Sequence, residues 1–66
     1  MRVESRLRAE RVKRLLTMGA LATLAGLSYD TVKRAERGGR ISDLSQERLA
    51  RALESTREEL FGDKVA

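Results

Sequence analysis

One pattern of helix starts recurs three times along the chain and strongly limits the folds that it can adopt. Each time, an apolar residue precedes a Ser or Thr, and a second apolar residue stands four positions after the hydroxyl. The hydroxyl can accept a hydrogen bond from an unpaired amide of the first helical turn, and the apolar residues can close as a hydrophobic staple. The instances are Leu16-Thr17…Leu21, Leu27-Ser28…Val32 and Leu44-Ser45…Leu49. They predict three successive helices.

Glycines and a fourth hydroxyl complete the set of helix boundaries. Gly26 and the pair Gly38-Gly39 follow expected helices, and glycine just beyond a helix adopts the left-handed backbone without Cβ strain. Thr56, with Glu59 in the capping-box position, predicts a last short helix. The chain has no Pro and is rich in helix formers. We therefore expect helices over residues 3–15, 18–25, 29–37, 46–54 and 57–61.

The chain is too short for more than one domain. Its 66 residues include no Cys and no His, which excludes disulfides and removes the usual ligands of structural zinc. We expect one all-α domain over residues 1–66, with its core over about 5–61, no metal, no cofactor, and self-association as reinforcement. The residues expected to face inward are Leu7, Val12, Leu16, Leu21, Leu24, Leu27, Val32, Ala35, Leu49, Leu53, Leu60 and Phe61. The pattern leaves Val3, Leu15, Met18 and Ile41 unassigned.

Positive charge is concentrated in the first two-thirds of the chain. Net charge is +4 at pH 7. Residues 1–16 carry six basic and two acidic side chains, residues 28–40 carry four and two, and residues 41–66 carry four and six. This asymmetry suits a protein that presents one face to a polyanion, although an ordinary solvated surface is the alternative. Most of the basic residues are Arg, which favours recognition of phosphate and guanine.

No segment favours secretion or membrane insertion. Residues 1–14 are charged throughout and lack the apolar stretch of a secretory signal. The longest uncharged stretch, 15–29, is interrupted by Gly, Ser and Thr and is too short to span a bilayer. The basic first helix has too few apolar residues to insert strongly into a membrane surface. We therefore expect a cytoplasmic protein with no membrane partner.

The central segment has the features of two short helices joined by a sharp turn. Ala22 is small enough to let the second helix cross the first closely, Gly26 permits the turn, and Leu27 and Val32 can fill the joint. These are the requirements of a helix-turn-helix, whose second helix can lie in the major groove of DNA.

This arrangement resembles the phage repressor and Cro family of XRE-type helix-turn-helix proteins. The matching pieces are Leu16-Thr17, Leu21-Ala22, Ala25-Gly26-Leu27-Ser28, Thr31-Val32, Glu36 with Gly38, Leu49-Ala50-Arg51-Ala52-Leu53 and Glu59-Leu60-Phe61. The resemblance covers about residues 5–61 and implies a compact five-helix, lambda-repressor-like domain. It also implies a homodimer that binds palindromic operator DNA in the nucleoid. With no second domain in view, a Cro-like or autoregulatory repressor is the favoured function.

The resemblance places the recognition helix at residues 29–37, with base-reading side chains at Tyr29, Asp30, Lys33 and Arg34. Helix geometry agrees, because these positions share a face opposite Val32 and Ala35. Arg34 can bond guanine through two hydrogen bonds, and Lys33 can reach guanine or phosphate. Tyr29 can pack on a thymine methyl or bond a phosphate. Asp30 can accept from cytosine N4 or orient Arg34 at the i,i+4 spacing, and we prefer the orienting role.

Phosphate contacts are expected on either side of this face. Thr17 and Ser28 stand at helix N-termini, where backbone amides attract anions. Arg11, Thr31, Arg37 and Arg40 are further candidates. Gly39 either lets the next loop approach the DNA strand or serves only in the helix cap.

The resemblance also implies an ion pair between Arg11 of the first helix and Glu36 of the recognition helix, which would hold the two helices together.

Three features of the sequence depart from the family pattern. Met18 stands where many members have a Gln that bonds phosphate, and Leu15 where many have Gly. Ser55, Arg57 and Glu59 stand where apolar residues commonly support dimerisation. The dimer is therefore expected to be polar and weak, to form on DNA, or to use Phe61.

Other functions remain as alternatives. General acid–base catalysis is disfavoured because the chain has no His or Cys and no phosphate-binding Gly loop. We therefore expect no enzyme activity. A DNA-binding antitoxin with a toxin partner, and a phage excision or architectural protein that bends DNA, both fit the same fold.

Overall fold

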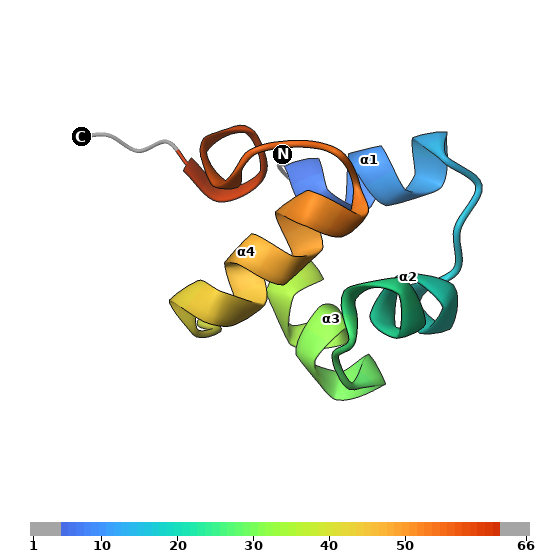
Figure 1. The fold of residues 1–66 in the computed structure, drawn as a ribbon, viewed down its shortest axis with the longest axis horizontal. Coiled ribbons are helices and arrows are strands. Elements are labelled where there is room, and N and C mark those ends of the chain that lie inside the picture. Colours follow the sequence, from blue (N-terminus) through green and yellow to red (C-terminus); the bar gives the residue numbers. More distant parts are fainter. Residues whose placement is uncertain (1–4, 63–66) are drawn as a thin grey trace.

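The computed structural model describes residues 5–62, which form five helices and no strand. They are α1 (Arg6–Lys13), α2 (Met18–Ala25), α3 (Tyr29–Glu36), α4 (Asp43–Ala52) and η1 (Glu58–Gly62), the last a π-helical turn. Helix α2 packs against α3 and α4, while α1 packs against α3 and η1. Figure 1 shows α4 crossing the middle of the molecule, with α2 and α3 on one side and η1 on the other. The predicted all-helical fold is confirmed.

A capping hydroxyl begins each of the four α-helices. The side chains of Ser5, Thr17, Ser28 and Ser42 each accept a hydrogen bond, of 3.0–3.1 Å, from the amide three residues later. The starts predicted at Thr17 and Ser28 are therefore confirmed, and so is the fourth, since Thr56 accepts from the amide of Glu59 at 3.1 Å. Helix α1 begins at Arg6, later than predicted, because Ser5 is its cap. Val3, which the sequence pattern left unassigned, lies outside the described residues.

The predicted cap at Ser45 is wrong. Ser42 begins α4, and Ser45 lies in its first turn, where its amide donates to the Ser42 hydroxyl at 3.1 Å. Two hydroxyls three residues apart can each cap a helix. The earlier one allows a longer helix and places Asp43 in the first turn, where the helix dipole favours a carboxylate. Leu44, predicted as part of the staple, is consequently exposed.

The core confirms most of the predicted inward positions. Leu16, Leu27 and Phe61 pack against its edge, as do the unassigned Met18 and Ile41. The buried members of the predicted set are Leu7, Leu21, Val32, Ala35, Leu49, Leu53 and Leu60.

Two predicted core residues, Val12 and Leu24, are wrong, with 48% and 60% of their surface exposed. In α2 the buried side consists of Leu21, Ala22 and Ala25, so Leu24 is rotated away from it. The two alanines let α2 approach its neighbours closely. In α1 the residue four positions after Leu7, and therefore on the same side of the helix, is Arg11. Its hydrogen bonds to Glu36 and to the Leu16 carbonyl occupy the inner side on which we expected Val12.

Leu15 combines an unfavourable backbone conformation with nearly full exposure. Its φ is 59°, in the left-handed region, and 91% of its surface is accessible. It closes α1, because the next amide, that of Leu16, donates to the carbonyl of Arg11 at 3.1 Å. A residue with a Cβ in this conformation costs about 1–2 kcal/mol.

We expect Leu15→Gly to raise the free energy of unfolding by about 1 kcal/mol, because the strain disappears and almost no buried surface is lost. The melting temperature should rise by about 4 °C in thermal denaturation. Leu24→Ala is the control, since it removes an exposed leucine from helical backbone and should give no such gain. A melting temperature of Leu15→Gly at or below that of the parent would contradict this account.

Candidate DNA interface

The turn between α2 and α3 is closed by local hydrogen bonds that fix the angle between the two helices. Gly26 ends α2 with a left-handed φ of 70°. The amide of Leu27 then donates to the carbonyl of Ala22 at 2.9 Å, and Ser28 caps α3. On the inner side of α3, Val32 and Ala35 are buried. The opposite side of α3 is therefore held facing outward.

The four predicted base-reading residues, Tyr29, Asp30, Lys33 and Arg34, are all exposed. Arg37 lies on the same side one turn further and is exposed as well. The structure shows no ion pair between Asp30 and Arg34, so it lacks the orienting contact that we preferred from the sequence. Within residues 5–62, the side chains of Lys33, Arg34 and Arg37 have no hydrogen-bond or ion-pair partner either. Three cations thus project from α3 and its C-cap residue with their side-chain donors unused.

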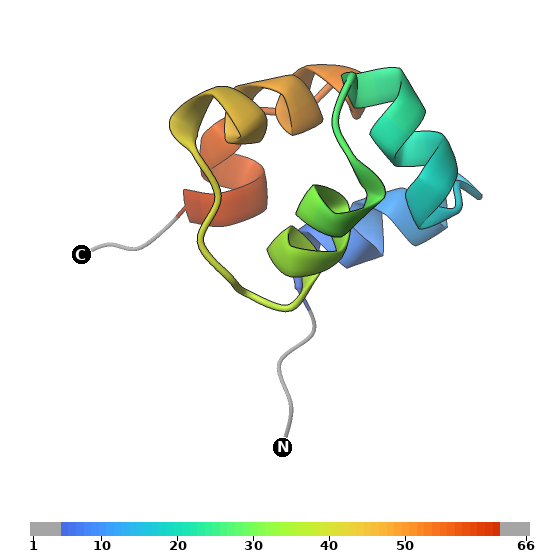
Figure 2. The same ribbon diagram turned by 90° about the horizontal axis from the view of Figure 1, so that it is seen from below.

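Two surface hollows adjoin this side of α3. The first is lined by Asp30, Lys33, Arg34 and Arg37, together with the two glycines that follow the helix. The second lies between α3 and the start of α4, and it is lined by Thr31, Arg34, Arg40, Ile41, Ser42 and Ser45. Figure 2 shows how the intervening loop swings out beside α3 before it joins α4. Arg34 borders both hollows, and cations outnumber carboxylates in each, so this surface attracts anions.

The structure contains the ion pair between Arg11 and Glu36, and both side chains are largely buried, with 12% and 7% of their surface exposed. The Arg11 Nε donates to one carboxylate oxygen, and Nη2 donates to the other at 3.0 Å. The hydrogen bond to Glu36 raises the pKa of Arg11, whereas burial lowers it. Nearby Tyr29 raises this pKa by a smaller amount. Nη1 donates to the carbonyl of Leu16 at 2.8 Å. One side chain therefore joins α1, the end of α3 and the turn before α2.

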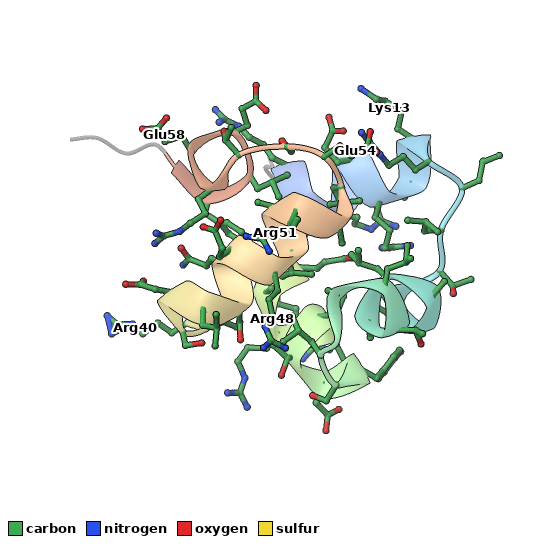
Figure 3. All side chains as sticks on the ribbon, in the orientation of Figure 1. Lys13, Arg40, Arg48, Arg51, Glu54 and Glu58 are labelled. Carbon is green, nitrogen blue, oxygen red and sulfur yellow. The ribbon has the colours of Figure 1, made fainter. Side chains whose placement is uncertain are left out.

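This position separates Arg11 from the other predicted phosphate contacts. Its donors are bonded to Glu36 and to the Leu16 carbonyl, and only 12% of the side chain is exposed, unlike the side chains on the outer side of α3. Arg37 and Arg40 are exposed, and Figure 3 shows Arg40 pointing away from the body of the molecule. Thr17 and Ser28 are exposed at the starts of α2 and α3. Thr31 is half-buried and its hydroxyl lies 2.9 Å from that of Ser28.

Two arginines that sequence reasoning missed stabilise the arrangement. Arg48 of α4 donates to the carbonyl of Gly26 at 3.3 Å and so contacts the turn between α2 and α3. Arg57 donates to Asp43 at 3.2 Å and to Gln46 at 3.0 Å, which holds the segment before η1 on α4. Both contacts join residues far apart in the chain, and no local pattern could have indicated them.

The fold and this cationic surface are those of a DNA-binding transcriptional regulator. The chain matches the helix-turn-helix family model over residues 7–60 and belongs to that family. Among solved structures it is similar to the restriction-modification controller protein C.AhdI from Aeromonas hydrophila. The two share 40% sequence identity over 85% of this chain and 86% of that chain, with a TM-score of 0.77. No curated protein sequence matches the chain. No helix within residues 5–62 is both long and apolar enough to cross a membrane.

Proposed function

We propose that this protein is a sequence-specific repressor that inserts α3 into the major groove of a palindromic operator. The observation that carries the proposal is the outward side of α3, where Lys33, Arg34 and Arg37 lie exposed and unpartnered among residues 5–62 while the inner side is locked into the core. Lys33 and Arg34 read bases, with Tyr29 and Asp30 beside them. Thr17, Ser28, Thr31, Arg37 and Arg40 contact phosphates on either side.

The likeness to a restriction-modification controller supports gene regulation over the antitoxin and architectural alternatives. We infer a Cro-like or autoregulatory role in the cytoplasm, in which the protein acts by binding alone and performs no catalysis. A toxin partner is not needed for this role.

We further propose that the operator-bound form is a homodimer. A hollow between α4 and η1 supports this, because it combines polar side chains with the half-buried ring of Phe61. Its lining residues are Gln46, Glu47, Ala50, Ser55, Thr56, Arg57, Glu58 and Phe61. The many polar groups favour a weak dimer that two adjacent half-sites on DNA bring together.

Selection of bound duplexes from a random DNA pool, at a fixed salt concentration, tests the proposal. We expect a palindrome whose half-sites lie about one helical turn apart. Affinity for the selected duplex should fall steeply as salt rises, because each neutralised phosphate releases counterions. A pool without an enriched sequence, or an affinity insensitive to salt, would refute the proposed function.

A further inference from the structure

We propose that Gly39 sets the direction of the Arg34 side chain and is thereby a specificity-determining positioning residue. The inference rests on the proposed function, in which Arg34 reads a base. The amide of Gly39 donates to the carbonyl of Arg34 at 2.9 Å, so the loop after α3 folds back onto that residue. A Cβ on Gly39 would lie 2.6 Å from Cγ of Arg34, 3.1 Å from its carbonyl oxygen and 3.4 Å from Cδ. The glycine leaves the space that the stem of Arg34 occupies.

Backbone conformation does not account for this glycine. The left-handed residue after α3 is Gly38, with φ 85°, whereas Gly39 lies outside that region. A Cβ on Gly38 would meet no atom within 4 Å. The neighbouring glycines therefore have different roles: Gly38 is required by the backbone, and Gly39 by the side chain of Arg34.

A methyl group at residue 39 would change where the guanidinium of Arg34 points. Cγ is held directly by the first side-chain torsion, so it cannot move aside by bending the far end of the chain. The torsion itself must change, and a helix allows few alternatives. Since Arg34 borders both hollows beside α3, a new rotamer reshapes the surface offered to DNA.

The test compares Gly39→Ala with Gly38→Ala on the selected operator and on operators altered one base pair at a time. We expect Gly39→Ala to weaken binding by about tenfold, in the range of one lost bidentate base contact, and to flatten the preference at the base pair that Arg34→Ala also flattens. Gly38→Ala should lower the melting temperature because of its left-handed backbone and keep that base preference. Unchanged affinity and preference in Gly39→Ala would overturn the proposal.

The double variant Arg34→Ala/Gly39→Ala tests the role of Gly39 separately from base reading by Arg34. Alanine at residue 34 has no Cγ, so adding Gly39→Ala should cause no further loss of affinity. A further loss would overturn the role of Gly39. If Gly39→Ala proves unstable, the double variant should recover most of the lost melting temperature, because only the 3.1 Å contact with the backbone carbonyl oxygen of residue 34 remains. No recovery at all would also overturn the role of Gly39. If Arg34→Ala alone binds the operator normally, the proposed reading by Arg34 is wrong, and the inference that rests on it is wrong as well.

Discussion

Glu36→Ala is expected to lower the melting temperature and the DNA affinity together. The substitution removes the carboxylate that accepts two hydrogen bonds from Arg11, a side chain of which only 12% is exposed in the intact pair. The remaining hydrogen bond, to the Leu16 carbonyl, leaves the positive charge without a counter-charge. Removing one partner of a buried ion pair costs about 3–5 kcal/mol. For a domain of this size each kcal/mol corresponds to about 4–8 °C, so the melting temperature should fall by more than about 10 °C. Affinity should fall as well, because α3 loses its attachment to α1.

Arg51→Ala is the control for this experiment. It removes the 3.7 Å ion pair with Glu47. Both side chains are exposed, so the pair contributes little to the free energy of unfolding. In thermal denaturation monitored by circular dichroism, the free energy of unfolding of Arg51→Ala should differ from that of the parent by no more than about 0.5 kcal/mol. An unchanged melting temperature in Glu36→Ala would show that the pair does not hold the recognition helix.

Simultaneous replacement of Lys33 and Arg34 with Ala is expected to abolish specific binding and leave the fold intact. Both side chains are exposed and have no partner within residues 5–62, so the free energy of unfolding should change by less than about 1 kcal/mol. Each base contact contributes about 1–3 kcal/mol of discrimination. Affinity for the selected operator should therefore fall by about a hundredfold, measured by fluorescence anisotropy, towards the affinity for unrelated DNA.

A matched variant separates base reading from loss of charge. Lys13→Ala/Arg51→Ala also removes two positive charges, both from exposed positions away from the outer side of α3 (Figure 3). It should retain operator preference and lose only a modest factor in affinity through the weaker overall field. Equal losses in the two double variants would mean that net charge, not α3, determines binding.

The sequence predicted the fold well where the signals were local. The caps at Thr17, Ser28 and Thr56 depend on atoms within three residues, so single motifs reveal them. Ser42 and Ser45 defeated the same reasoning, because both hydroxyls satisfy the local rule and only the longer helix decides between them. Val12 and Leu24 were misplaced since apolar character alone does not say which side of a helix the neighbouring elements cover.

The placement of the candidate DNA-contacting side chains on the fold was predictable to a similar extent. Helical periodicity was enough to put Lys33 and Arg34 opposite Val32. The ion pair expected between Asp30 and Arg34 is absent from the structure, because spacing permits an ion pair on an exposed helix without enforcing it. The contacts of Arg48 with Gly26 and of Gly39 with Arg34 depend on how loops fold back in three dimensions. No local pattern in the sequence indicates these two contacts.

Modified bases test most directly whether α3 reads bases from the major groove. In the selected operator, 7-deazaguanine removes the N7 acceptor that faces the major groove, while inosine in place of guanosine removes the amino group that faces the minor groove. We expect 7-deazaguanine at one position of each half-site to weaken binding of the parent protein and to leave binding of Arg34→Ala unchanged. Inosine at the same position should leave binding of the parent protein unchanged. Binding that is lost with inosine and kept with 7-deazaguanine would contradict the claim.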